Sequence, residues 1–117
     1  MREAAILLVE DDALIRMMIA DMLEELGHRV VAETGRIDEA RKLAETTQFD
    51  VALLDINLGG ESITPVAQIA ESRGLPFLFI SGYQTSGLPE RFKTRPLLTK
   101  PFIISKLKVF IEEMLAP

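Results

Sequence analysis

The chain has 117 residues, 48% of them hydrophobic, which predicts one globular domain with its own core. It contains no cysteine, which excludes disulfides and thiolate chemistry, and its single histidine excludes a multi-histidine metal centre. The net charge of −5 argues against direct binding to nucleic acid. No apolar run is long enough to cross a membrane and no signal-peptide pattern opens the chain, so we expect a cytoplasmic protein with no membrane partner.

An apolar run over residues 4–9 ends directly at Glu10-Asp11-Asp12, which predicts a buried strand that runs into carboxylates. From Ala13 onward the apolar residues recur with helical spacing, so a helix is expected, with Asp12 as its N-cap and Gly27 at its end. His28 follows that glycine in a turn and is expected at the surface.

Residues 29–34 are typical of a strand with charged ends, and a helix with an apolar face follows it. Within the stretch 51–57, four apolar residues run into Asp55 and the chain then becomes polar, which predicts a second buried strand with Asp55 at its end. Ser62 is the predicted N-cap of the next helix, with Pro65 tolerated in its first turn.

The remaining elements are a strand over 77–80 that ends at Ser81, a short strand over 96–99 that ends at Lys100, and a final amphipathic helix. The segment 84–95 contains Gly87 and Pro89, so any helix there is expected to be short or distorted.

Strands and helices alternate along the whole chain, which predicts an α/β fold with a parallel sheet covered by helices on both faces. The first, third and fourth strands are the most apolar and are expected at the centre. A doubly wound, flavodoxin-like five-stranded sheet of order 2-1-3-4-5, with strands numbered along the chain, satisfies these constraints.

In this order the carboxyl ends of the first and third strands are neighbours, so Asp11, Asp12 and Asp55 should converge, with Ser81 and Lys100 at the same edge. Clustered carboxylates without histidine or cysteine favour Mg²⁺ or Mn²⁺. An aspartate there can act as a nucleophile that accepts a phosphoryl group. Each residue alone has a simpler interpretation, as a helix cap, a loop hydrogen bond or a surface charge, but their coincidence at four strand ends favours a site.

Four motifs in matching order and spacing carry a family resemblance: Glu10-Asp11-Asp12, Asp55, Ser81-Gly82 and Lys100-Pro101-Phe102. Over the whole chain, the sequence resembles a single receiver domain, residues 1–117, of two-component response regulators. The resemblance implies that Asp55 accepts a phosphoryl group from a histidine kinase or a histidine phosphotransfer protein. It also implies a non-enzymatic switch, with slow self-dephosphorylation at most.

The same resemblance implies roles for further residues. The metal would be held by Asp11, Asp12, Asp55 and the backbone carbonyl of Asn57. Ser81 and Lys100 would contact the phosphate. The Lys100–Pro101 peptide bond would be cis, as it usually is in the family.

The chain departs from the family at Leu97, where receivers commonly carry an aromatic residue that swings inward on activation. The stretch Phe79–Tyr83 is similar to a subgroup with a Phe-x-Thr-Gly-Tyr-like motif, often found as single-domain regulators in alphaproteobacteria. We hypothesise that Tyr83, or the loop that carries it, takes over part of the switching, and that Asn57 and Tyr83 tune dephosphorylation.

The resemblance further implies a downstream protein partner at the fourth helix, fifth strand and last helix, and a monomer or a phosphorylation-dependent dimer. Two alternatives remain open: a degenerate receiver that binds partners without phosphorylation, and a Mg²⁺-dependent phosphatase or phosphotransferase. Asn57 stands where such an enzyme needs a second acid/base aspartate, which argues against the latter. A flavin-binding fold is weaker still. The sequence leaves open the cognate kinase, the target, the phosphoryl lifetime, and whether the chain acts alone or as part of a longer protein.

Overall fold

The computed structural model of the chain describes residues 3–82 and 88–116, and strands and helices alternate through both ranges. The first half contains β1 (Ala5–Val9), α1 (Ala13–Glu25), β2 (Arg29–Thr34), α2 (Ile37–Thr46) and β3 (Val51–Asp55). The second half contains β4 (Asn57–Leu58), β5 (Glu61–Ser62), α3 (Thr64–Ser72), β6 (Phe77–Ser81), the 3₁₀ turn η1 (Glu90–Phe92), β7 (Leu97–Thr99) and α4 (Ile104–Leu115).

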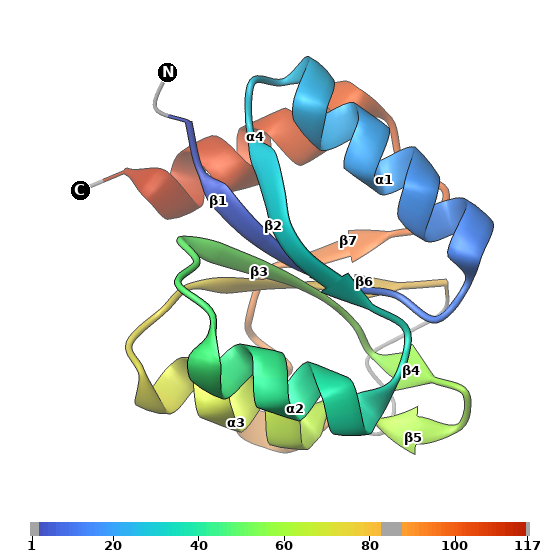
Figure 1. Cartoon of the computed structure of the whole chain (residues 1–117), viewed down its shortest axis with the longest axis vertical. Helices are drawn as coiled ribbons and strands as arrows, with labels where there is room; N and C mark the ends of the chain where they lie inside the picture. Colours follow the sequence, from blue (N-terminus) through green and yellow to red (C-terminus); the bar gives the residue numbers. More distant parts are fainter. Residues whose placement is uncertain (1–2, 83–87, 117) are drawn as a thin grey trace.

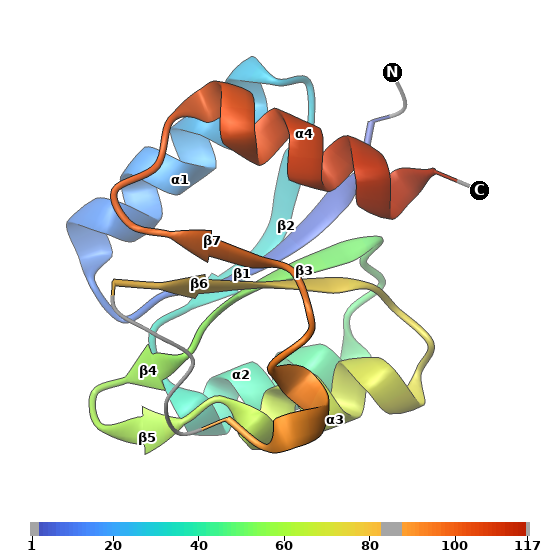
Figure 2. The same cartoon turned by 180° about the vertical axis from the view of Figure 1, so that it is seen from behind.

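Five strands form one sheet in the order β2-β1-β3-β6-β7, and all neighbouring strands are parallel. The predicted order is therefore confirmed, with β6 and β7 as the fourth and fifth strands of the sheet. Helices α1 and α4 cover one face, whereas α2 and α3 cover the other (Figure 1). Seen from behind, η1 lies on the same side of the sheet as α3 (Figure 2).

Each face of the sheet carries its own apolar core because successive side chains of a strand point to opposite faces. Leu54 and Phe79 belong to the core under α2 and α3, whereas their neighbours Leu53 and Ile80 belong to the core under α1 and α4. In β1, β3 and β6 every residue is buried. This explains why those three strands are almost continuously apolar in sequence and lie at the centre of the sheet.

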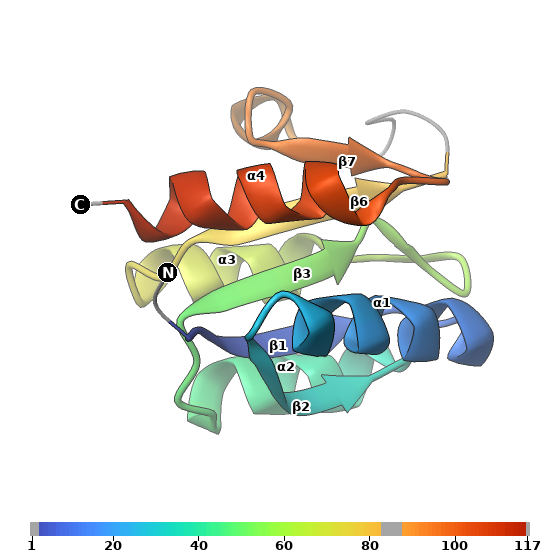
Figure 3. The same cartoon turned by 90° about the horizontal axis from the view of Figure 1, so that it is seen from above.

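The functional edge of the sheet lies at the carboxyl ends of the strands. In the view from above, the strands point away from the two chain ends and toward the β4–β5 hairpin (Figure 3). In parallel sheets of this kind, ligands bind outside the carboxyl ends, where β1 and β3 lead to helices on opposite faces. Helix α1 begins there, and the Asp12 carboxylate accepts a hydrogen bond from the Ile15 amide, as predicted for its N-cap.

The β4–β5 hairpin was not predicted, because the segment after Asp55 was interpreted as a loose loop. Asn57 pairs with Ser62 and Leu58 with Glu61 in antiparallel register. The two residues between the strands, Gly59 and Gly60, have φ values of 58° and 89°. Two consecutive positive φ angles are the requirement of a type I′ hairpin turn, which a Gly-Gly pair meets without strain.

Two local predictions near this hairpin and near the chain start are wrong. Helix α3 begins at Thr64, so Ile63 and not Ser62 is its N-cap. The Ser62 hydroxyl instead accepts a hydrogen bond from the amide of Thr64, the first residue of the helix. His28 is buried, 4% exposed, because its Nδ1 accepts the Ala4 amide at 3.0 Å and joins the start of β1 to the turn after α1. Burial lowers the pKa of this imidazole.

Between β6 and β7 the described residues contain the 3₁₀ turn η1 and no α-helix. This agrees with the short or distorted helix predicted from Gly87 and Pro89. The segment is held against α3 because the Glu71 carboxylate pairs with Arg91 at 3.1 Å and Arg95 at 3.0 Å. None of the described helices is long and apolar enough to cross a membrane.

Candidate functional site

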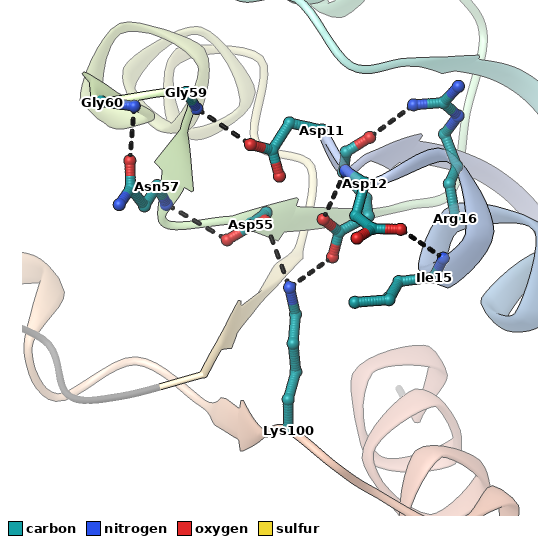
Figure 4. Close-up of polar contacts among 10 residues, drawn as sticks. Asp11, Asp12, Ile15, Arg16, Asp55, Asn57, Gly59, Gly60 and Lys100 are labelled. Atoms are coloured by element: carbon teal, nitrogen blue, oxygen red, sulfur yellow. Dashed lines mark hydrogen bonds and ion pairs between the residues drawn. The ribbon is translucent and has the colours of Figure 1, made fainter.

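Three carboxylates gather at the carboxyl ends of β1 and β3. Glu10 and Asp11 follow β1, and Asp55 is the last residue of β3. Each residue offers an oxygen that lies within 4.8 Å of the oxygens of the other two. Glu10 is completely buried and Asp55 is 4% exposed, whereas Asp11 is exposed. Asp11 and Asp55 project toward a common space between β1 and the β4–β5 hairpin (Figure 4).

Lys100 supplies the counter-charge. Its side chain extends from the end of β7 to the carboxylates (Figure 4). Its Nζ lies 2.6 Å from Glu10 Oε1 and 3.3 Å from Asp55 Oδ2. The Lys100 backbone amide donates to the Ser81 carbonyl at 2.7 Å, which ties the end of β7 to the end of β6. A single ammonium therefore neutralises part of the charge of the carboxylate group.

Burial and hydrogen bonds within the group change the pKa values of its members. Burial, and then hydrogen bonding to Asp55, raise the pKa of Glu10 from 4.5 to about 7. Burial opposes ionisation of Asp11, but hydrogen bonding with Glu10 and the Gly59 amide holds the pKa of Asp11 below its usual value. Burial also opposes the charge of Lys100, yet its hydrogen bond to Glu10 and the charge of Asp55 raise the pKa of the ammonium. The pKa of Glu10 is thus raised while that of its neighbour Asp11 is lowered.

Backbone amides of the hairpin orient two of the carboxylates. The Asn57 amide donates to Asp55 Oδ1 at 3.1 Å, and the Gly59 amide donates to Asp11 Oδ2 at 3.0 Å. The Asn57 side chain accepts the Gly60 amide at 2.8 Å and so braces the turn (Figure 4). The β4–β5 hairpin therefore joins the acidic end of β1 to the acidic end of β3.

The group of close carboxylates differs by one residue from the predicted metal ligands. Among the described residues, the close group consists of Glu10, Asp11 and Asp55, and Asp12 is outside it. The reason is the start of α1, because the Asp12 carboxylate accepts the Ile15 amide at 3.0 Å while its own amide donates to Glu10. The signal was available in the sequence: the third acid of the triplet directly precedes the helix, so capping uses it and leaves Glu10 to the site.

The other predicted residues are placed as follows. Ser81 ends β6 and is buried at the same sheet edge as Asp55. Leu97 is half-buried in β7, beside Phe79 and against the core under α2 and α3, so it packs as an ordinary sheet residue. The Lys100–Pro101 peptide bond is cis, as predicted. Tyr83 lies outside the described residues.

Three carboxylates and a lysine thus meet at the carboxyl edge of a doubly wound parallel sheet, where such sheets bind their ligands. Residues 6–112 match the family model described as response regulator receiver domain. The chain therefore belongs to the response regulator receiver domain family, whose members are the receivers of two-component response regulators.

Similar proteins agree with this assignment. The transcriptional regulatory protein PdtaR of Mycobacterium tuberculosis is 36% identical over 92% of this chain and 54% of its own length. The phyllosphere-induced regulator PhyR of Methylorubrum extorquens is 34% identical over 94% of this chain and 43% of its own. The solution structure of SdrG from Sphingomonas melonis Fr1 has a TM-score of 0.85 and 37% identity, covering 97% of this chain and 98% of that one. The chain thus spans about half the length of the curated relatives PdtaR and PhyR.

Proposed function

We propose that Asp55 accepts a phosphoryl group from a phosphohistidine of a histidine kinase or histidine phosphotransfer protein, with Mg²⁺ bound beside it. The observation that carries this proposal is the placement of Asp55. Its carboxylate lies at the end of a central strand, near two other carboxylates and 3.3 Å from the Lys100 ammonium. The Asn57 amide holds Asp55 Oδ1, and Lys100 attracts Oδ2, so the carboxylate is fixed for attack.

The residues present fit a hard divalent cation. All the clustered donors are carboxylate oxygens, and their charge exceeds that of the single lysine. Asp11 and Asp55, with Glu10 and the backbone carbonyl of Asn57, would hold the ion. When bound, Mg²⁺ supplies positive charge to the phosphoryl oxygens.

In the reaction an Asp55 oxygen forms a bond to phosphorus as the bond from phosphorus to the donor's imidazole nitrogen breaks. The product is an acyl phosphate, and the imidazole leaves with its electron pair. Lys100 is placed to pair with a phosphoryl oxygen, and the Ser81 hydroxyl lies at the same sheet edge. Asn57 and Tyr83 are the residues we propose for tuning hydrolysis of the acyl phosphate.

Intact-mass spectrometry after incubation with acetyl phosphate tests this function. We expect one phosphoryl adduct that requires Mg²⁺ and that is absent from Asp55→Asn. Asp50→Asn serves as the matched control, because this carboxylate pairs with the Ala5 amide at the other end of the sheet. A wild-type chain that takes up no phosphoryl group, either from acetyl phosphate or from phosphorylated kinases, contradicts the proposal.

The N-cap role of Asp12 gives a separate prediction. Asp12→Ala should cost about 1 kcal/mol of stability, because α1 loses its N-cap, and Asp12→Ser should restore most of it. Both variants should bind Mg²⁺ like the wild type in calorimetric titrations. A large loss of Mg²⁺ affinity in Asp12→Ser, which keeps the cap, would return Asp12 to the metal site.

We also propose that phosphorylation changes the surface formed by η1, β7 and α4, and that a downstream protein partner binds there. This surface adjoins Lys100, which contacts Asp55 directly. Helix α4 and the residue before it expose apolar side chains, with Ile103 64% and Val109 53% exposed. Because Leu97 cannot act as an aromatic toggle, Tyr83 or its loop is the proposed substitute.

A further inference from the structure

Arg16 lies directly behind the acidic group and holds the backbone that carries it. Its Nη1 donates to the Glu10 carbonyl oxygen at 2.6 Å, and its Nε pairs with Glu33 Oε1 at 3.3 Å. The Arg16 side chain is only 22% exposed. Arg16 therefore links α1, the end of β1 and the end of β2 at one point.

Gly35 makes this close arrangement possible. A Cβ atom at this position would lie 2.8 Å from Arg16 Nη1, 3.1 Å from the Asp11 Cα and 3.2 Å from the Glu10 carbonyl oxygen. The backbone after β2 thus packs against both the guanidinium and the acidic turn. The Glu10 amide also donates to the Thr34 carbonyl at 3.0 Å, so the turn is held from the β2 side by its amide and from the α1 side by its carbonyl.

We infer that Arg16 is a positioning residue for the metal and phosphoacceptor site, and this rests on the proposed function. By fixing the Glu10 carbonyl, it sets the orientation of the peptide between Glu10 and Asp11, whose two carboxylates face Asp55 from β1. Without it the turn can rotate, and those carboxylates lose their common position. Groups that orient metal ligands in this way commonly change metal affinity by about 10- to 100-fold when removed.

The sign of the effect separates positioning from simple electrostatics. A guanidinium near a cation site repels the cation, so loss of its charge alone would tighten Mg²⁺ binding. Loss of positioning would weaken it. Arg16→Ala should therefore raise the Mg²⁺ dissociation constant by about tenfold. Arg16→Lys keeps the charge and one donor, and it should restore part of the affinity.

Gly35→Ala tests the same contact without changing Arg16. The added methyl group meets the guanidinium, the Asp11 Cα and the Glu10 carbonyl, so it should push the arginine off the turn and weaken Mg²⁺ binding in the same direction. Gly35 does not have a positive φ, so this substitution adds no backbone strain of that kind.

Arg73 provides a matched control. Its Nη1 also donates to backbone carbonyls, at 2.6 Å to Ala44 and 2.9 Å to Thr47, and its guanidinium packs over the Phe49 ring. It joins α3 to the end of α2, away from the acidic group. Arg73→Ala should reduce thermal stability as a structural arginine does, with an unchanged Mg²⁺ dissociation constant.

The experiment measures Mg²⁺ binding by calorimetry and the amide resonances of Asp11 and Gly59 by NMR for all these variants. The rate of phosphoryl uptake at saturating Mg²⁺ and the thermal stability are measured alongside. We expect weakened Mg²⁺ binding and shifted resonances in Arg16→Ala and Gly35→Ala, partial recovery in Arg16→Lys, and neither effect in Arg73→Ala. An Mg²⁺ dissociation constant that stays within about twofold of the wild type in Gly35→Ala and Arg16→Ala, or that falls in Arg16→Ala, overturns the inference. A wild type that binds no Mg²⁺ overturns the proposed function itself.

Discussion

Lys100→Met is expected to lower the free energy of unfolding by roughly 3 to 5 kcal/mol at pH 8 without Mg²⁺, as removal of one partner of a buried charge group does. The ammonium lies 2.6 Å from Glu10 and 3.3 Å from Asp55, both buried, so its loss leaves these carboxylates without their cation. Methionine retains most of the aliphatic stem, so packing around the side chain changes little.

Mg²⁺ should reverse much of this loss. The variant presents the same oxygens to a cation but has no competing ammonium, so its affinity for Mg²⁺ should exceed that of the wild type. Bound ligand stabilises the folded state according to its concentration over its dissociation constant. Phosphoryl uptake should nevertheless be slower, because Lys100 no longer pairs with the transferred group.

Urea unfolding with and without Mg²⁺ measures both effects. Lys93→Met is the matched control, because its ammonium pairs with Glu90 at 3.1 Å but the two side chains are 40% and 90% exposed. Exposed pairs of this kind contribute about 0 to 1 kcal/mol, so this control should unfold almost as the wild type does. Equal losses in the two variants, or a Lys100→Met chain that Mg²⁺ fails to stabilise, would contradict the assigned role of Lys100.

The sheet order and the position of Asp55 at the end of β3 could be predicted from the sequence, because both depend on apolar strands that end in polar residues. The five parallel strands, the helices on both faces and the positions of Ser81 and Lys100 follow from that pattern. The prediction nevertheless placed Asp12 among the metal ligands and left out Glu10, although Asp12 directly precedes the helix and was itself the predicted N-cap. The hydrogen bond from the Ile15 amide to Asp12 decides the matter, and it depends on where α1 begins.

Other errors came from contacts between residues far apart in the chain. His28 was expected at the surface from its place after a glycine turn, but the Ala4 amide donates to it across 24 residues of sequence. The contact of Arg16 with the Glu10 carbonyl could not be predicted either. Helical spacing shows which residues share a face of the helix, but not which backbone group a long side chain reaches. The β4–β5 hairpin was signalled by Gly59-Gly60, but its flanking strands are too short for an alternating pattern.

The contribution of Glu10 to the stability of the metal-free chain should fall as the pH rises from 5 to 8.5. Without Mg²⁺ the pKa of Glu10 is raised from 4.5 to about 7 in the folded state, so folding takes up a proton between these values. The corresponding stabilisation is complete below pH 4.5, declines as the pH approaches 7 and is absent above it. Between pH 5 and pH 8.5 this pKa difference corresponds to a loss of roughly 2 to 3 kcal/mol in the free energy of unfolding.

His28 acts in the opposite direction over part of the same range. Burial lowers its pKa, so the neutral imidazole stabilises the fold above pH 6.5 and this contribution is lost on acidification. The total curve of the wild type therefore combines two opposing slopes. Comparison with Glu10→Gln isolates the carboxylate, because the glutamine cannot titrate and leaves the His28 contribution unchanged.

Mg²⁺ should invert the dependence on Glu10. A bound cation favours the ionised carboxylate, so binding releases a proton near pH 7 and Mg²⁺ affinity should increase as the pH rises. Urea unfolding from pH 5 to 8.5, with EDTA or with saturating Mg²⁺, should show a stabilisation by Mg²⁺ that grows with pH in the wild type and stays nearly constant in Glu10→Gln. Parallel pH profiles for the two proteins in EDTA would mean that Glu10 is already ionised in the folded chain, and the electrostatic account of the acidic group would have to be replaced.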